Sequence, residues 1–201
     1  MSDAPQTAGR RERNKQAKLE RILTAAGELF AERGVEEVTT QQIADRADIG
    51  TGTLFLYARN KGELLLLVQN AHYEAALERG RAAAEARPDV TDAVMAIVQQ
   101  VVECNRKHVE NGRTYLREMV FGDPGEPHHG KALAIAAQTG EAIAAILGRD
   151  GHTGPEDAAT RARIVSAVMF VSMATAVDRA IRTEDVVRDI RGQIEILLAR
   201  R

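Results

Sequence analysis

The sequence has little of several features that mark particular classes of protein. It contains a single cysteine, Cys104, in 201 residues. One cysteine excludes a disulfide framework within the chain and fits a reducing compartment. The basic amino terminus is followed by no apolar core of a signal peptide, and the apolar run of residues 64–68 is far too short to cross a bilayer. We therefore expect a cytoplasmic protein without a membrane segment.

Net charge is also small, because 27 Lys and Arg residues face 29 Asp and Glu residues. This near-neutrality argues against a strongly basic protein that coats nucleic acid, so any DNA binding must come from a local cluster. One such cluster lies near the amino terminus and consists of Arg10, Arg11, Arg13, Lys15, Lys18 and Arg21. It can contact phosphates, or it can be a solvated flexible arm.

Signatures of catalysis and of metal binding are missing as well. No phosphate-binding glycine loop, paired-carboxylate motif or zinc pattern is present. Cys104 and His108 are four residues apart on one expected helix, but no third group is in place to orient them, and a lone cysteine is usually a small core residue. His128 and His129 are adjacent, so their side chains point apart and match no metal spacing. We expect no catalytic residue, no metal site and no cofactor.

The most informative stretch runs over residues 38–61. Thr39 with Gln42 three residues later has the spacing of a capping box, which predicts a helix from Thr40 to about Ala47. Asp48 tolerates the left-handed conformation of a tight turn. A second helix should begin at Gly50 or Thr51.

The first turn of that second helix carries Thr51, Gly52 and Thr53, which let a backbone approach another surface closely, whereas Leu54 and Phe55 lie further in and can pack. Two short helices joined in this way predict a helix-turn-helix whose second helix lies in the DNA major groove. Base readout should be modest, because no Arg or Lys stands at the start of the second helix to pair with guanine.

Residues 22–68 closely resemble the amino-terminal domain of the TetR family of bacterial transcriptional regulators. The resemblance rests on ILTAAGELFAERG in the first helix, TQQIADRA in the second, GTL in the third and Asn-Lys before a leucine-rich fourth helix. The sequence departs from the family at Asp48, Gly50, Thr51 and Ala58, where Gly, Ser, Lys and Phe are common. The loss of that Lys removes a DNA contact, and the loss of that Phe removes an aromatic side chain that packs the domain.

The resemblance implies an all-α fold of about nine helices and a homodimer that acts as a repressor on palindromic double-stranded operator DNA and is released by a small-molecule effector. It divides the chain into a flexible basic arm (1–14), a helix-turn-helix domain (15–62) and a larger helical domain for ligand binding and dimerisation (63–201). The expected DNA-binding residues are Thr39, Thr40, Gln41, Gly50, Thr51, Gly52, Thr53, Tyr57 and Lys61. The expected ligand-pocket residues are Tyr73, Met95, Cys104, His108, Tyr115, Met119, Phe121, Met169, Phe170 and Met173, which suit an ordinary core equally well.

The remaining helices follow from caps and apolar periodicity. We predict helices from Lys61 toward Arg87, from Pro88-Asp89 to about His108, from Arg113 to Phe121, and from about His128 to Leu147. Asn111-Gly112 is predicted to be a turn, and residues 122–127 a loop. Pro155 should open the next helix, and the last should run from Asp185 to Leu198. Wide apolar faces on these last two helices favour subunit pairing over closure of the monomer core.

A second class of function stays open at this point. The protein could be an enzyme or a small-molecule carrier whose helix-turn-helix no longer serves DNA, since the overall charge is near neutral and the recognition helix lacks its Lys. The dependence of duplex binding on salt separates the two classes.

Overall fold

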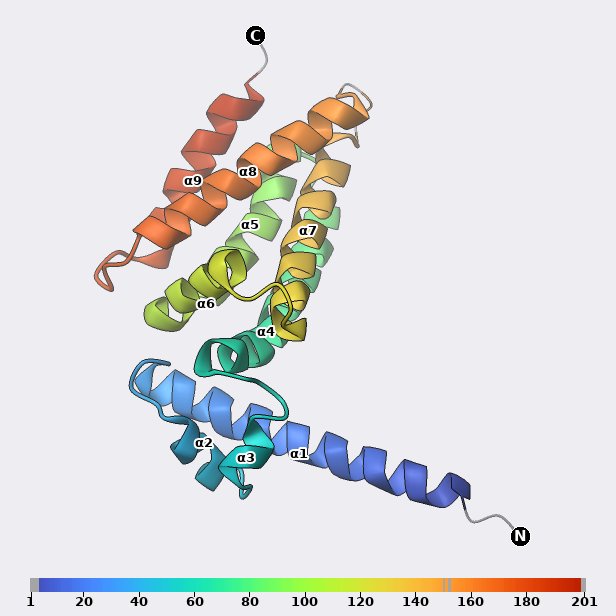
Figure 1. Ribbon diagram of the computed structural model, residues 1–201. Helices are drawn as coiled ribbons and strands as arrows, with labels where there is room; N and C mark the ends of the chain where they lie inside the picture. Colours follow the sequence, from blue (N-terminus) through green and yellow to red (C-terminus); the bar gives the residue numbers. More distant parts are fainter. Residues whose placement is uncertain (1–3, 150, 152, 200–201) are drawn as a thin grey trace.

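The computed structural model describes residues 4–149, 151 and 153–199. These residues form helices only, as expected for an all-α fold (Figure 1). The helices are α1 (Ala4–Arg33), α2 (Thr40–Arg46), α3 (Thr51–Leu54), α4 (Lys61–Glu85), α5 (Val90–Arg106), α6 (Val109–Phe121), α7 (Pro127–Leu147), α8 (Pro155–Thr175) and α9 (Thr183–Leu198).

Helices α1 to α3 form a small domain at one end of the molecule (Figure 1). Ile22, Leu29 and Phe30 of α1 are fully buried against α2 and α4, and Leu54 anchors α3 in the same core. Gly34 ends α1 with φ of 81°, a conformation that glycine adopts without steric strain. The first helix therefore ends directly before Gly34, the last residue of the ILTAAGELFAERG motif.

Residues 1–14 were predicted to form a flexible arm, but the structure shows a helix in this segment. From Ala4 onward these residues belong to α1, which extends as one helix well past α2 and α3 (Figure 1); residues 1–3 lie outside the described part. The reason is local: Arg, Glu, Lys, Gln and Ala, all strong helix formers, fill residues 10–21, and they continue the helix that packs from Leu19 onward. The basic residues from Arg10 to Arg21 are therefore part of α1.

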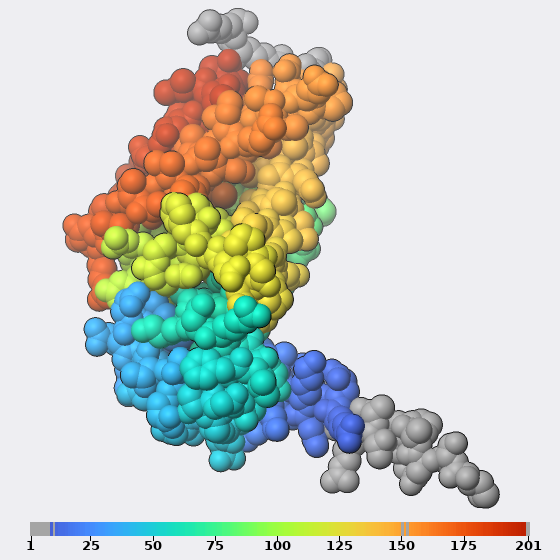
Figure 2. Space-filling model, in the orientation of Figure 1, coloured from blue at the N-terminus to red at the C-terminus, as the bar shows by residue number. Residues whose placement is uncertain are grey.

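Helices α4 to α9 form the larger domain. α4 and α5 are antiparallel neighbours, α7 packs on both α4 and α8, and α9 packs on α5 and α8. Buried Val94, Ile97, Ile143, Val165 and Ile190 fill the space between these helices. Figure 2 shows α6 and the start of α7 resting on the amino-terminal half of α4, where the two domains meet.

The turn predicted at Asn111-Gly112 is wrong, because both residues lie inside α6. Its N-cap is His108, whose ring Nδ1 accepts from the N–H of Asn111. Gly112 is needed for packing: a Cβ there would lie 2.1 Å from the carbonyl oxygen of Asn105. Asn111 is 2 % exposed and bonds to backbone far away in the sequence. A dipeptide typical of turns is used here for a close helix contact.

Other predicted boundaries hold. Asn60 caps α4, Asp89 caps α5 and Pro155 opens α8. α5 ends at Arg106, two residues before the predicted end. No helix in the described residues is both long and apolar enough to cross a membrane.

Candidate DNA-binding surface and effector cavity

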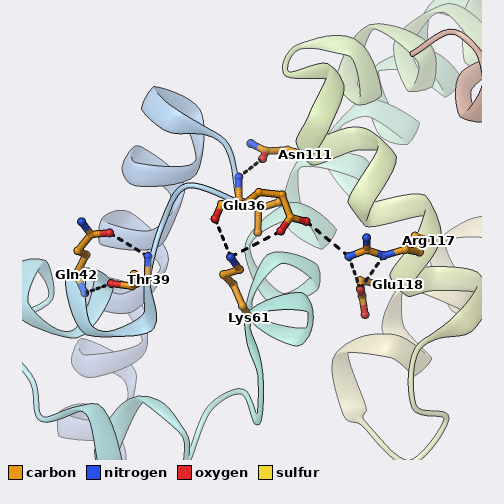
Figure 3. A network of polar contacts seen from close by, with 8 residues as sticks. Glu36, Thr39, Gln42, Lys61, Asn111, Arg117 and Glu118 are labelled. Carbon is orange, nitrogen blue, oxygen red and sulfur yellow. Dashed lines mark hydrogen bonds and ion pairs between the residues drawn. The ribbon is translucent and has the colours of Figure 1, made fainter. Parts of the chain in front are cut away.

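The α2–α3 unit has the local geometry that the sequence predicts. The Thr39 hydroxyl accepts from the N–H of Gln42, and the Gln42 side chain accepts from the N–H of Thr39, which completes the capping box (Figure 3). Asp48 has φ of 51°, the left-handed value expected for this turn. Arg21 of α1 donates to the carbonyl oxygen and the carboxylate of Asp48 at 3.3 and 3.2 Å. The turn is therefore tied to the long first helix.

The starts of α2 and α3 are joined by a side-chain bridge. The Thr51 hydroxyl donates to Oε1 of Gln41 at 2.7 Å, and Nε2 of Gln41 donates to Asp45 at 2.7 Å. This bridge fixes both side chains before any partner arrives, which lowers the entropy lost on binding. It also occupies the hydrogen-bonding groups of Gln41.

The residues expected to meet DNA are all accessible. Thr39, Gln41, Gly50 and Gly52 are exposed; Thr40, Thr51, Thr53, Tyr57 and Lys61 are half-buried. Tyr57 is held by its hydroxyl, which donates to the carbonyl oxygen of Lys15 at 3.2 Å. Sequence reasoning missed Leu56, which is 83 % exposed, and placed Phe55 in the core, although it is 43 % exposed. An apolar pair directly after GTL was the signal available.

Free positive charge lies on α1 rather than beside α3. Arg11, Arg13, Lys15 and Lys18 are exposed, and none of them has an ion-pair partner among the described residues. By contrast, Lys61 donates to the carbonyl oxygen of Glu36 at 3.1 Å and lies 3.9 Å from its carboxylate. The cations best placed for phosphates are thus those of the extended first helix.

Asn111 of α6 holds the end of α1 from across the domain boundary (Figure 3). Its Oδ1 accepts from the N–H of Val35 at 2.7 Å, and its Nδ2 donates to the carbonyl oxygen of Phe30 at 2.7 Å. Both partners are buried, so these bonds are shielded from water. Nearby, Glu36 also lies 3.8 Å from Arg117 of α6, which makes Glu36 a bridge between Lys61 and α6.

A second junction connects Tyr57, three residues after the end of α3, to the start of α7. Nε2 of His128 lies 2.9 Å from the carbonyl oxygen of Tyr57. The backbone N–H of His128 donates to the buried carboxylate of Glu63 at 2.7 Å. Burial raises the pKa of Glu63, although the N–H groups of His128 and His129 oppose this rise. Arg59 adds an ion pair to Glu126 at 2.9 Å. These contacts connect the start of α7 to Tyr57 and to the start of α4.

A cavity of about 730 Å³ lies where the two domains meet. Its walls come from α1, α4, the end of α5, the start of α6 and the start of α9; they include Gly27, Ala31, Val68, His72, Tyr73, Arg79, Cys104, Asn105, Arg106, His108, Asn111 and Val187. This volume falls in the usual range for small-molecule sites. A molecule held there touches the DNA-binding domain through α1 and also contacts Asn111.

The structure brings three of the ten expected pocket residues to this cavity, namely Tyr73, Cys104 and His108. Tyr115 lies directly behind and stacks on Tyr73 with ring centroids 4.2 Å apart. Met95, Met169 and Met173 are buried in the helical core away from these walls, Met119 and Phe170 are half-buried, and Phe121 is 82 % exposed. The sequence missed the contribution of α1 and α9, because no periodicity shows which helices meet.

Buried hydrogen bonds lead from the cavity to His128. The Asn105 side chain donates to the Tyr73 hydroxyl at 2.8 Å, the stacked Tyr115 donates to Asn70 at 2.9 Å, and Asn70 donates to the carbonyl oxygen of His128 at 3.0 Å. Desolvation by burial raises the pKa of both tyrosines, so both hydroxyls stay protonated at physiological pH, that of Tyr73 accepting and that of Tyr115 donating in these bonds.

Cys104 and His108 do not lie on one helix. They were expected on one helix, but α5 ends at Arg106 and His108 has the extended backbone of an N-cap. Burial raises the pKa of the Cys104 thiol to about 11, so it is not an activated nucleophile. No group of three His, Cys, Asp or Glu residues in the described chain is arranged to hold a metal ion.

The fold and these two sites define a class of protein: a helical transcription regulator with a helix-turn-helix at one end and a cavity at its domain junction. Comparison with known proteins agrees. Residues 22–68 match the family model described as "Bacterial regulatory proteins, tetR family". The HTH-type transcriptional repressor KstR of Rhodococcus jostii (strain RHA1) is 26% identical over 180 residues, which cover 89% of this chain and 81% of KstR.

Solved structures show the same fold. Thermus thermophilus FadR, a TetR-family repressor in complex with lauroyl-CoA, is 24% identical with a TM-score of 0.68, over 91% of this chain and 96% of that one. FadR of Bacillus subtilis, in complex with stearoyl-CoA, is 18% identical with a TM-score of 0.66, over 90% and 97%. Residues 22–68 therefore match the TetR family of bacterial transcriptional regulators, and the chain as a whole shares the fold of these solved structures.

Proposed function

We propose that this protein is a homodimeric repressor that leaves a palindromic operator when a small molecule enters the cavity at the domain junction. The observation that carries the proposal is the position of this cavity, whose walls include α1 of the DNA-binding domain and Asn111, the residue that clamps the end of α1. Binding there has a direct mechanical path to the helix-turn-helix.

On the DNA side, phosphate contacts come from Thr39, Tyr57, Lys61 and the cations of α1, and they set the register on the duplex. The start of α3, from Gly50 to Thr53, enters the major groove. Lys61 can serve DNA only by sharing its ammonium group with Glu36, so operator binding and the Glu36–Arg117 contact are coupled.

On the effector side, a ligand that contacts Asn105 or Asn111 changes contacts at two junctions. One leads through Asn111 to the end of α1, and the other through the stacked tyrosines, Asn70 and His128 to Tyr57. A ligand shifts the equilibrium only by its difference in affinity for the two arrangements. The acyl-CoA thioesters held by two structural neighbours are the first compounds to test.

A dimer is supported by the outer face of α8 and α9. Val171 of α8, Ile196 of α9, and Val177 and Ile181 of the connection between them are all at least 40 % exposed. An open groove lined by Val168, Ser172 and Val186 runs between the two helices. Apolar side chains exposed on adjacent helices and on their connection suit a two-fold interface. Two recognition helices would then read two half-sites.

The test is a selection of duplex fragments from genomic DNA with the purified protein, followed by titration of the recovered duplex at rising salt. We expect a palindrome and a steep loss of affinity with salt, with a slope smaller by about 1 for Lys15→Ala. Lys131→Ala is the matched control, since Lys131 pairs with Glu74 in the other domain and its loss should leave the slope unchanged.

Two results would contradict the proposal. If the protein retains no specific duplex at low salt, a small-molecule carrier becomes a better description of its function than a repressor. An effector that binds in the cavity yet leaves operator affinity unchanged would refute the release step. For lauroyl-CoA and stearoyl-CoA, we expect binding to lower operator affinity at least about fivefold, the lower end of usual allosteric coupling.

A further inference from the structure

The surface beside the recognition helix is apolar at the point where a hydrogen-bonding reader would be expected. We call Gly50, Gly52, Phe55 and Leu56 the α3 patch. Leu56 is 83 % exposed and gains little from packing within the chain, and Phe55 keeps 43 % of its surface exposed. α3 ends at Leu54, and Phe55 and Leu56 lie in the turn directly after it, where the N–H of Leu56 donates to the carbonyl oxygen of Thr53. A leucine left in water this way gains burial only against a partner.

The two glycines of the patch are not required by the fold. Neither has a positive φ, and a Cβ built on either one meets no atom within 4 Å. Gly52 lies inside α3, where glycine is less stable than alanine, whereas Gly50 is the N-cap of this helix. Glycine at a position with room for a side chain is explained when another surface approaches the backbone closely. The patch is thus shaped for a partner that contacts main chain at Gly50 and Gly52.

Hydrogen-bonding readers next to the patch are already engaged. Gln41 accepts from the Thr51 hydroxyl and donates to Asp45, so the amide that could otherwise pair with adenine is held within the protein. Asp45 and Asp48 place carboxylates near the turn, and Arg21 is bonded to Asp48. Fewer side chains are therefore left for readout by direct hydrogen bonds, and apolar contact gains weight as a source of discrimination.

The charge around the patch identifies the partner as a polyanion. The hydroxyl of Tyr57, the residue after Leu56, bonds to the backbone of Lys15, which places the exposed cations of α1 beside the patch. A polyanion that also offers apolar groups to a helix is duplex DNA, whose major groove displays the 5-methyl group of thymine.

We propose that Leu56, supported by Phe55, is a specificity-determining residue that reads thymine 5-methyl groups in the major groove, and that Gly50 and Gly52 allow the backbone to come close enough for this contact. The inference rests on the proposed DNA-binding function. It predicts that the protein selects thymine at one or more positions of each half-site through the methyl group alone.

The test uses one duplex synthesised in two forms. The operator is first recovered from a randomised duplex library with the full-length protein, and it is then made with thymidine or with deoxyuridine, which removes the methyl and keeps every hydrogen-bonding group. Wild type should bind the thymidine form about fourfold tighter for each methyl contact, the roughly 0.8 kcal/mol of one buried CH₂-sized group. Two symmetric contacts should give about fifteenfold.

Leu56→Ala should bind the two forms equally and should bind the thymidine form more weakly than wild type. Leu133→Ala, which truncates another exposed leucine on α7, should keep the wild-type ratio. Gly52→Ala should weaken binding to both forms at least about tenfold while thermal stability stays equal or rises, because alanine favours helix but adds a methyl facing the groove.

Each contrary result has a separate meaning. If no specific duplex is recovered, the proposed function fails and the inference fails with it. If a specific duplex is recovered but lacks thymine, binds equally in both forms, or keeps its ratio with Leu56→Ala, the function stands and the inference is overturned. If Leu56→Ala leaves DNA affinity unchanged and alters the molecular mass in light scattering, another copy of the chain covers the patch, which also overturns it.

Discussion

Asn111 of α6 accepts a hydrogen bond from the backbone N–H of Val35 at 2.7 Å, although the two residues are 76 positions apart. The same side chain donates to the carbonyl oxygen of Phe30, so one buried amide satisfies the backbone at the point where α1 ends. The DNA-binding domain is thus held to the larger domain by specific polar contacts, and this contact is open to mutation.

Asn111→Ala should lower the free energy of unfolding by about 2–3 kcal/mol, because the buried N–H of Val35 loses its partner. Urea denaturation measures the change. Arg117→Ala is the comparison: its guanidinium group is 57% exposed and pairs with Glu36 and Glu118 at the same junction, so its loss should change stability by less than about 0.5 kcal/mol. Equal effects of the two variants would show that the amide clamp contributes nothing special.

Gly112→Ala should destabilise the protein by about 1–3 kcal/mol or more, since the new methyl would overlap the carbonyl oxygen of Asn105 and force α5 and α6 apart. Thermal unfolding gives the measurement. Gly140→Ala, also in a helix interior, meets only Ser166 Oγ at 3.8 Å and should be neutral or stabilising by up to about 1 kcal/mol. A neutral Gly112→Ala would contradict the close contact of α5 and α6.

The Cys104 thiol should react slowly with iodoacetamide. With a pKa raised to about 11 by burial, its thiolate fraction at pH 8 is about a hundredth of that of an ordinary cysteine, so alkylation should be slower by about that factor and should speed up as pH rises toward 11. Mass spectrometry follows the reaction, and protein unfolded in urea provides the reference rate. Fast alkylation of the folded protein at pH 8 would show that Cys104 is neither buried nor shifted.

Val171→Glu should convert the proposed dimer to a monomer. Val171 is 55 % exposed on α8 within one chain, so the substitution leaves the fold intact but places a charge in an apolar interface. Light scattering should report a mass near 21.9 kDa instead of twice that value. Ala83→Glu on the exposed side of α4 should keep the dimer mass. A wild-type chain that is already monomeric at micromolar concentration would refute the interface.

Much of the amino-terminal domain is determined by residues that act on their immediate neighbours. Thr39 with Gln42, Asp48 in its left-handed turn, Gly34 after α1 and Asn60 before α4 each satisfy backbone groups within a few positions, so their sequence pattern predicts their geometry. The same local rules predict α8 from Pro155. They also carry the resemblance to the TetR family, because its motif consists of these caps and of the small core residues between them.

Features that depend on contacts between residues far apart in the sequence are decided only by the tertiary structure. Asn111-Gly112 has the composition of a turn, but its bonds to Val35 and Phe30 and its contact with Asn105 make it helical. The cavity has walls from α1 to α9, and the exposure of Leu56 depends on which helices cover the end of α3. Local hydrogen bonds form between near neighbours and can be read in order along the chain, whereas burial and cavities depend on how separate helices pack together.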